Sequence, residues 1–442
     1  MRYLKIVLSL ALTVACSRPP ESPVAPGGQK RLTFSILEDY DKGQDLDDAR
    51  RDFELFAELG ITTWRGSFGW DDYEPARGRY DFDWLHRFAE LAAAHHITLR
   101  PYIGYTPSWA AAGGTDRDVW NDPPADLDAW ARFVQTLAAE MRRHRNIVSY
   151  EIYNEENARQ WWDGTPATYR EVLRRAIAAI KAGNPDAQLL LGGMVYPDTQ
   201  WLDAICDGDG SGRQVDVIPF HAYPETWEDV PAESYLGPSF ESGFVASADE
   251  ACGRKPLWIN EVGYATTPGR TESEQAEWWA RAIATFAAEP RIEHIGIYEI
   301  KDAPRDKPVI GDAPNYHLGL ADPQRRKKLA FKTIKLLVAL LGTQPIAPAT
   351  PRVGTPAGAS LAPEVYRHLF IGADGQRVLF LWTRTADASI DVQLGGAARE
   401  VVEYGIDGTR SGQRPVRDGW LRAVALRRGV VRIFATRSDP AS

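Results

Sequence analysis

The sequence lacks a basic tract, and it lacks an apolar segment long enough to span a membrane. Its formal net charge is −9 at pH 7, without a long run of Lys or Arg, so we do not expect it to bind nucleic acid. The apolar stretch at residues 6–15 has about half the length that a bilayer-spanning helix needs. Hydrophobic residues still make up 44% of the 442 residues, which is ample for a core and for more than one domain.

Cysteine is scarce, with three in the chain. Cys16 ends MRYLKIVLSLALTVAC, in which basic residues precede the apolar stretch as in a secretory signal. TVAC resembles a bacterial lipoprotein signal, so we expect residues 1–16 to be a signal peptide and Cys16 to be lipidated, with simple secretion as the alternative. The Pro-rich residues 17–30 then form a tether. We expect an exported protein of the cell envelope whose membrane contact is this anchor.

The other two cysteines, Cys206 and Cys252, lie far apart in the sequence. An exported chain can carry a disulfide, but two cysteines pair only where the fold brings their Cα atoms within about 7 Å. The sequence leaves a disulfide and two buried thiols equally open.

Motifs for cofactor and metal chemistry are also missing. No Gly-x-Gly-x-x-Gly follows the first expected strand, which argues against a dinucleotide-binding sheet. No His-x-His follows it either, which disfavours a metal-dependent barrel hydrolase. In DYDKGQDLDD, residues 39–48, the Gly comes one place early for an EF-hand calcium loop, and no Glu closes it. We therefore expect neither a cofactor nor a metal.

Residues 31–343 alternate short β-branched or aromatic runs with amphipathic stretches. The expected strands are RLTFSIL, TTWRGSF, ITLRPYIGY, IVSYEIY, AQLLLGG, VDVIPFHAY, PLWINEVGY and HIGIYEI. Helical spacing is clearest over residues 45–59, 84–95, 127–143, 168–182, 272–289 and 325–341. Eight strand–helix units predict an α/β fold, the (β/α)8 TIM barrel. An open doubly wound sheet fits less well, because polar residues collect at the carboxyl ends of many strands.

The pattern of apolar and polar residues changes after the predicted barrel. Residues 344–354 are typical of a linker, and residues 355–442 alternate apolar and polar side chains with period two, with turn signals such as ADG and IDG. This pattern predicts a small C-terminal antiparallel β-domain, similar to a sandwich.

The stretch YEIYNEEN, residues 150–157, places three Glu at the end of the fourth expected strand. Strand interiors disfavour Glu, and an unpaired buried carboxylate is costly. By strand alternation Glu151, Tyr153 and Glu155 share one face, while Leu257, Ile259 and Glu261 share a face of the seventh strand. These strands lie on opposite sides of a barrel, so Glu155 and Glu261 can face each other across its mouth.

Two carboxyl groups about 5 Å apart are the arrangement of a retaining glycosidase. EIYNEEN resembles the Asn-Glu motif of the large clan of retaining (β/α)8 glycoside hydrolases, and WINEVGY resembles the nucleophile strand of that clan. Residues 60–110, from GITTWRGSF to TPSWA, are similar to its second and third units. Families 39 and 5 are the nearest in pattern.

The resemblance implies that Glu155 is the general acid/base and Glu261 the nucleophile. Asn154 would bind the sugar 2-hydroxyl, His221 and Tyr223 would orient the nucleophile, and Arg65 would keep it ionised. Glu156 replaces the usual Pro, which leaves a one-residue ambiguity over the acid, although a solvated neighbour is the expected role of Glu156. Glu151 is expected to pair with Arg65 or Arg100, and Arg65 or His221 could serve structure alone.

Aromatic residues are the remaining substrate-binding candidates. Tyr298 stands where a Trp often forms the sugar platform of the clan. Trp70, Trp109 and Trp161 could each stack on a sugar or fill a core, and the sequence does not separate these roles.

The function expected is cleavage of O-glycosidic bonds of a poly- or oligosaccharide by double displacement, with carbohydrate as the partner and a monomer as the working form. A barrel that binds glycan without cleaving it would explain the Trp-bearing loops but not the Glu pair. A transglycosylase would use the same residues and differ only in the acceptor.

Overall fold

The computed structural model describes residues 28–114, 117–206, 210–306, 309, 311–355, 364–396 and 398–436. The predicted signal peptide, Cys16 and residues 17–27 of the predicted tether lie outside these ranges. Lys30, assigned to the tether, is instead tied to the fold, because it forms a β-bridge with Ile346 and its ammonium group donates to the carbonyl of Ile292 at 2.6 Å. None of the helices described has the length and apolarity needed to cross a bilayer.

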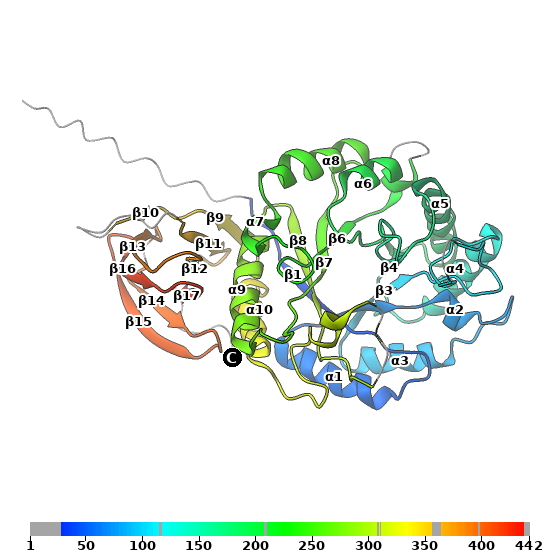
Figure 1. Ribbon diagram of the computed structural model, residues 1–442, viewed down its shortest axis with the longest axis horizontal. Coiled ribbons are helices and arrows are strands. Elements are labelled where there is room, and N and C mark those ends of the chain that lie inside the picture. The colour runs from blue at the N-terminus through cyan, green and yellow to red at the C-terminus, as the bar shows by residue number, and fades with distance from the viewer. Residues whose placement is uncertain are drawn as a thin grey trace, which may run out of the picture.

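The predicted (β/α)8 barrel is confirmed (Figure 1). Its parallel strands are β1 (Thr33–Leu37), β2 (Thr63–Ser67), β3 (Thr98–Ile103), β4 (Ser149–Ile152), β5 (Gln188–Leu190), β6 (Ile218–Ala222), β7 (Leu257–Val262) and β8 (Ile292–Tyr298). They run in the order β5-β4-β3-β2-β1-β8-β7-β6. The amide of Leu191 donates to Val217 and that of His221 to Met194, so β5 and β6 meet and the sheet closes.

Helices surround the barrel where the periodicity predicts them. These are α1 (Leu46–Leu59), α3 (Asp83–Ala94), α4 (Leu127–Met141), α5 (Pro166–Gly183), α9 (Glu272–Ala288) and α10 (Leu329–Leu341). Asp45, Asp126, Thr165 and Thr271 cap four of them by accepting first-turn amides. The short elements α2 (Trp70–Tyr73), α6 (Thr199–Cys206), α7 (Ala232–Tyr235), α8 (Ala246–Ala251) and a π-helix, η2 (Phe240–Val245), were not predicted. They contain too few turns for a clear period.

The second domain is a single antiparallel sheet in the order β10-β13-β16-β15-β14-β17-β12-β11-β9. Its strands are β9 (Ile346–Ala349), β10 (Val353–Gly354), β11 (Tyr366–Gly372), β12 (Arg377–Trp382), β13 (Ala388–Gln393), β14 (Glu400–Tyr404), β15 (Arg410–Arg417), β16 (Trp420–Leu426) and β17 (Arg432–Ala435). One face of β11, β12 and β17 packs into the domain's own core, and the other joins the barrel's core. β12 and β17 are therefore buried on both faces and read as near-continuous apolar runs, whereas β16 has buried and exposed residues interspersed.

The predicted linker, residues 344–354, is wrong. Residues 346–349 form β9 and pair with β11, and β10 pairs with β13. Pro348 is tolerated because β9 is the last strand of the sheet, where a missing amide costs no internal hydrogen bond. The two domains are thus joined without a free spacer.

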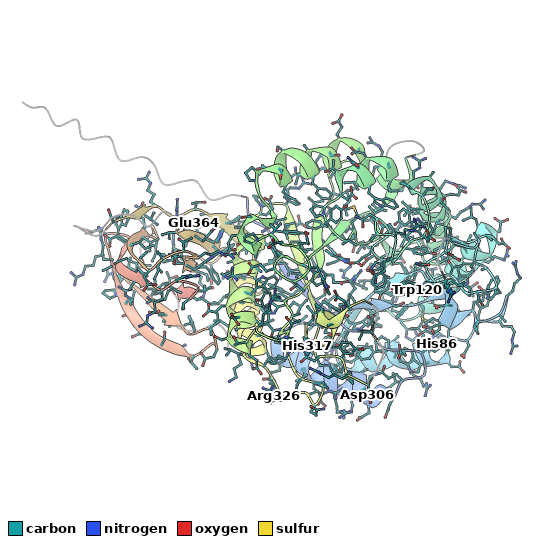
Figure 2. The ribbon with its side chains drawn as sticks, viewed as in Figure 1. His86, Trp120, Asp306, His317, Arg326 and Glu364 are labelled. Atoms are coloured by element: carbon teal, nitrogen blue, oxygen red, sulfur yellow. A yellow bond between two sulfur atoms is a disulfide. The ribbon has the colours of Figure 1, made fainter. Side chains whose placement is uncertain are left out.

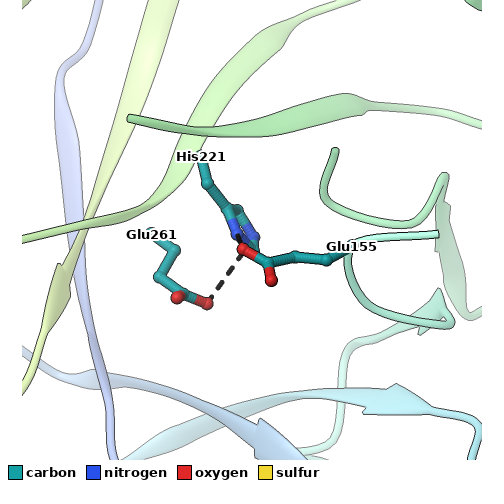
Figure 3. Close-up of side chains that lie close together, drawn as sticks. All are labelled: Glu155, His221 and Glu261. Atoms are coloured by element: carbon teal, nitrogen blue, oxygen red, sulfur yellow. Dashed lines mark hydrogen bonds and ion pairs between the residues drawn. The ribbon is translucent and has the colours of Figure 1, made fainter. Parts of the chain in front are cut away.

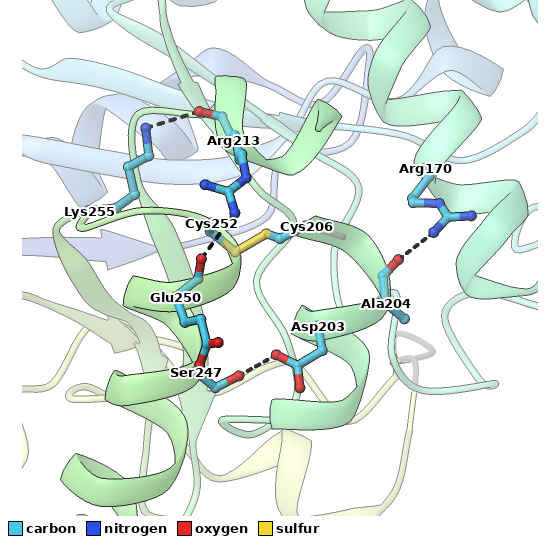
Figure 4. The surroundings of a disulfide bond; sticks show 9 residues. All are labelled: Arg170, Asp203, Ala204, Cys206, Arg213, Ser247, Glu250, Cys252 and Lys255. Atoms are coloured by element: carbon cyan, nitrogen blue, oxygen red, sulfur yellow. Dashed lines mark hydrogen bonds between the residues drawn. A yellow bond between two sulfur atoms is a disulfide. The ribbon is translucent and has the colours of Figure 1, made fainter. Parts of the chain in front are cut away.

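Cys206 at the end of α6 and Cys252 after α8 form a disulfide, with their Cα atoms 5.0 Å apart (Figure 4). The alternative of two thiols is therefore wrong. The bond ties the fifth barrel unit to the sixth across 46 residues.

Reduction of this disulfide should lower the melting temperature, because a closed loop of that length restricts the unfolded chain by about 3–4 kcal/mol. Calorimetry with and without reductant, and on Cys206→Ser/Cys252→Ser, would measure the effect. A double variant that melts with the oxidised wild type in both conditions would contradict it.

Candidate active site

Glu155, His221 and Glu261 come from three barrel strands and meet at their carboxyl ends (Figure 3). One nitrogen of His221 and one carboxyl oxygen from each Glu lie within 4.8 Å of one another. Each Glu is only 8% exposed. The structure therefore brings together the pair that strand alternation placed on facing strands.

Left-handed backbone, not strand alternation, aims the end of β4. Tyr153 and Glu155 have φ of 67° and 54°, a conformation uncommon for residues other than Gly and frequent at functional sites. Tyr153 turns outward and contacts Trp130 of α4 and Trp162 of the loop before α5. The expectation that Tyr153 shares a face with Glu151 and Glu155 is thus wrong. The turn leaves Asn154 and Glu155 free to reach the barrel mouth.

A β-bulge aims Glu261. Between Ile259 and Val262, β7 has one residue more than the facing part of β8, and the same step appears opposite β6. Asn260 points inward, where its amide donates to Glu151 at 2.9 Å, and the extra residue lets the adjacent Glu261 face the site too. The expectation that Glu261 shares a face with Leu257 and Ile259 is therefore wrong, because the bulge breaks the alternation between Ile259 and Val262. Gly296 of β8 accommodates the bulge, since a Cβ there would lie 2.0 Å from the Asn260 carbonyl oxygen.

Arg65, at the centre of β2, connects the floor of the site to the nucleophile candidate. Its Nε and Nη2 donate to Glu151 at 3.0 and 2.6 Å, and Nη1 donates to Glu261 Oε2 at 2.8 Å. Nη2 also donates to Asn154 Oδ1 at 2.7 Å. Of the two partners expected for Glu151, Arg65 is therefore the correct one. Arg100 instead donates to Ser149 and Gln188.

The two residues expected to orient the nucleophile have different partners, because Tyr223 hydrogen-bonds Glu261 and His221 hydrogen-bonds Glu155. The Tyr223 hydroxyl donates to Glu261 Oε1, whereas His221 Nδ1 lies 2.7 Å from Glu155 Oε1 and His221 Nε2 lies 3.6 Å from Glu261 Oε2. Burial lowers the pKa of His221 to about 4, so this imidazole is neutral at pH 7. Because Arg65 points a donor at Nε2, at 3.5 Å, the assigned tautomer carries its proton on Nδ1 and donates to Glu155.

The two carboxyl groups differ in their electrostatic surroundings. Burial raises the pKa of Glu155 to about 8, against the opposing effects of Arg65 and a hydrogen bond from Trp161. Burial also raises the pKa of Glu261, but Arg65 and the Tyr223 hydroxyl act to lower it. Glu155 is therefore the group that holds a proton at neutral pH, and Glu261 is the better stabilised carboxylate.

Glu156 is not the solvated neighbour that the sequence suggested. It is 1% exposed, and its carboxyl packs so closely on the backbone that a Cβ on Gly192 would lie 2.0 Å from Oε2. Neither oxygen meets hydrogen-bond geometry among the described residues. Glu156 therefore points away from the mouth, and of these two carboxyl groups it is Glu155 that lies beside His221 and Glu261.

Burial raises the pKa of Glu156 to about 8, above its value in an unfolded chain. The folded protein therefore keeps a proton that the unfolded chain releases between about pH 4.5 and pH 8, and stability falls over that window. Glu156→Gln should remove this loss, so its melting temperature relative to wild type should rise from pH 5 to pH 8. A difference that stays constant over this range would contradict a buried, protonated Glu156.

Of the aromatic residues expected to bind substrate, some lie in the core and others lie beside the site. Trp70 is fully buried and packs on Trp130 and Phe133, so it fills the core and is not a sugar platform. Trp109 is partly buried against Trp70, and its indole donates to the Glu74 carbonyl at 2.9 Å. Trp161 borders Glu155, and Tyr298 at the end of β8 has its ring centroid 6.5 Å from that of Tyr223.

Two further aromatic residues escaped the sequence reasoning. Trp120, labelled in Figure 2, contacts Trp161 edge to face, at 5.6 Å between ring centroids. Because Trp161 borders Glu155, Trp120 adds a second aromatic ring on the Glu155 side. Trp227 is 40% exposed, and its ring lies 4.5 Å from that of Tyr223. Both stand on loops at carboxyl ends of barrel strands, and only that placement could have flagged them.

Glu155, His221 and Glu261 also form a set that could hold a metal ion. Its donors already have other partners, however, since His221 pairs with Glu155 and Glu261 accepts from Arg65 and Tyr223. A cation there would lie beside the Arg65 guanidinium, which disfavours it. The donor set suits proton transfer better than metal binding.

Comparisons with known proteins agree with this architecture. Residues 40–117 match the family model of glycoside hydrolase family 42, described as beta-galactosidase. No curated protein sequence matches the chain significantly.

Among solved structures, a family 39 glycoside hydrolase from Bacteroides cellulosilyticus WH2 is similar, with a TM-score of 0.71, 18% identity and coverage of 92% of this chain and 81% of that one. A monomeric beta-xylosidase from Caulobacter crescentus CB15 has a TM-score of 0.64 and 17% identity over 93% and 97% of the two chains. A family 30 endoxylanase from Clostridium papyrosolvens C71 has a TM-score of 0.64 and 15% identity over 93% and 98%. The chain thus has the fold of the (β/α)8 glycoside hydrolases, as its motifs predict.

Proposed function

We propose that the protein is a retaining O-glycoside hydrolase in which Glu261 is the nucleophile and Glu155 the general acid/base. The observation that carries the proposal is the Glu155–Glu261 pair, with one oxygen of each within 4.8 Å. Retaining glycosidases hold their carboxyl groups about 5 Å apart, whereas inverting enzymes need room for a water between them. The similarity in fold to glycoside hydrolases supports the same assignment.

In the first step Glu261 attacks the anomeric carbon while Glu155 gives its proton to the departing glycosidic oxygen, which forms a glycosyl ester and a free alcohol. The ester removes the negative charge of Glu261, so the pKa of Glu155 falls and its carboxylate can accept a proton from water. That water then attacks the anomeric carbon and releases Glu261. Arg65 and Tyr223 stabilise Glu261 as the charged leaving group.

The substrate proposed is a poly- or oligosaccharide. Trp161 and Trp120 lie on the Glu155 side, and Trp227 and Tyr298 lie on the Glu261 side. Aromatic faces on both sides of a cleavage point suit a chain of several sugar rings. Export is part of the proposal, and the Cys206–Cys252 disulfide supports it.

The test is intact-protein mass spectrometry of the chain lacking residues 1–16 after incubation with 2-fluoro xylosides, galactosides, mannosides and glucosides that carry activated leaving groups. A covalent adduct on Glu261 would establish the retaining mechanism and name an accepted sugar. Bound but uncut oligosaccharide, without an adduct, would instead favour a glycan-binding barrel. Products longer than the substrate would favour transglycosylation.

A further inference from the structure

The loop after β6 carries two residues of the site. Tyr223, its first residue, donates to Glu261, and Trp227 packs edge to face on Tyr223. Glu225 between them has φ of 63°, a strained conformation for a non-Gly residue that persists only where the surroundings enforce it. The shape of residues 223–235 therefore needs outside support.

Two carboxylates anchor this segment from behind. Glu225 accepts from the amide of Ala232 at 3.1 Å, which folds the loop onto the start of α7. Glu233 of α7 has a side chain only 1% exposed, and Arg281 of α9 bonds it at 2.7 Å. The same guanidinium lies 3.3 Å from Glu225. One cation of the barrel thus serves two buried or half-buried anions.

The second cation comes from the other domain. Arg384, just after β12, donates to Glu233 at 2.7 Å and to Glu225 at 3.0 Å. Trp382 at the end of β12 donates its indole proton to Glu233 at 2.8 Å. Trp382 is fully buried and stacks on Tyr366, so the donor is held rigidly.

The two carboxylates, Glu225 and Glu233, need the charge of Arg384 in addition to that of Arg281. Burial alone would raise the pKa of Glu233, but Arg281 and Arg384 hold it below its usual range. Without Arg384, two carboxylates would share one guanidinium in a largely dehydrated place, which is costly. The segment would then shift or open to water.

We propose that the second domain is a working part of the active site, in which Arg384 and Trp382 act as positioning residues that hold residues 223–235 and thereby set Tyr223 against Glu261 and Trp227 at the rim. The expected effect on activity rests on the proposed function, whereas the expected effect on the structure of residues 223–235 does not.

Other contacts between the domains supply a matched control. Glu277 of α9 accepts from the amide of Val431 at 2.8 Å, and Thr333 of α10 donates to the Ile406 carbonyl at 2.7 Å. Glu277 also interacts electrostatically with Arg281, which binds the loop, whereas the hydrogen bonds of Thr333 go to Leu329 and Ile406. Thr333→Val should therefore loosen the interface but leave the site unchanged.

The experiment compares Arg384→Met, Arg384→Lys and Thr333→Val with wild type in the full mature chain. Hydrogen exchange, measured without substrate, should be faster in residues 223–235 for Arg384→Met, intermediate for Arg384→Lys and unchanged for Thr333→Val. With a sugar that labels Glu261, kcat/KM of Arg384→Met should fall by about tenfold, as small misplacements of catalytic groups do. The acidic limb of the pH profile of kcat/KM should lie at higher pH in Arg384→Met than in wild type, because a loosened Tyr223 stabilises ionised Glu261 less well.

Exchange in residues 223–235 that equals wild type in Arg384→Met would overturn the proposal, whatever the activity. So would exchange that rises equally in Thr333→Val. If wild type forms no adduct with any sugar of the panel, the proposed function fails, and exchange alone still decides whether the second domain holds the loop.

Discussion

Glu261→Ala should lower turnover by about 10⁴-fold or more and should form no covalent adduct with any 2-fluoro glycoside. The substitution removes the atom that attacks the anomeric carbon, and nucleophile removal costs this much in other covalent mechanisms. It also frees Arg65 and Tyr223, which both donate to Glu261 in the native site. Rate measurements on an activated aryl glycoside, together with intact-protein mass spectrometry, provide the test.

A small anion gives this prediction its control. The cavity left by the Glu261 side chain lies beside the Arg65 guanidinium, so added azide should bind there, attack the anomeric carbon and restore part of the rate. The product would be a glycosyl azide of inverted anomeric configuration. Glu156→Gln, a change at a buried neighbour that faces away from the mouth, should keep nearly full activity. Full activity in Glu261→Ala would assign the nucleophile elsewhere.

Glu155→Ala should lose activity in proportion to how poor the leaving group is. A general acid contributes typically about 10²- to 10⁴-fold, but an activated phenol leaves without protonation. Glycosylation of Glu261 by a dinitrophenyl glycoside should therefore be nearly normal, while natural oligosaccharides should hardly be cleaved. Deglycosylation should also slow, because no base remains to activate water.

The pH profile gives a second reading of Glu155. The pKa of Glu155 is raised to about 8, so wild-type kcat/KM should be high below that pH and fall as the acid loses its proton above it. Because Glu155 and Glu261 interact, the limbs report the pair and not single residues. Glu155→Ala should lack the basic limb. A basic limb that survives unchanged would assign it to another group.

Sequence and structure agree on what depends on local pattern. Hydrophobic periodicity predicted the eight strands, six of the main helices and the β-strands of the second domain. Such prediction works because the helix and strand periods depend on residues that are close in the sequence. The strand order placed Glu155 and Glu261 on facing strands, but the alternation used to aim them was wrong, since left-handed backbone aims Glu155 and a bulge aims Glu261. Arg65 beside Glu261 followed from the resemblance to known motifs.

The predictions for Tyr153 and Glu156 were wrong because contacts with residues distant in the sequence set their orientation and burial. Alternation misplaced Tyr153 because Glu155 and Tyr153 adopt left-handed backbone, which the packing of Trp130 and Trp162 enforces. Solvation was assumed for Glu156, but the approach of Gly192 from the next strand buries it.

The sequence by itself determined the barrel, the strands that carry the carboxyl pair and the second sheet, since each depends on residue type and spacing along the chain. Tertiary structure alone decided the burial that raises the pKa of Glu155 and the bulge that turns Glu261 inward. It also decided the reach of Arg384 from the second domain to Glu225 and Glu233. These features arise from desolvation and from contacts between segments that lie apart in the sequence, by as many as 159 residues for Arg384 and Glu225, which neighbouring residues do not encode.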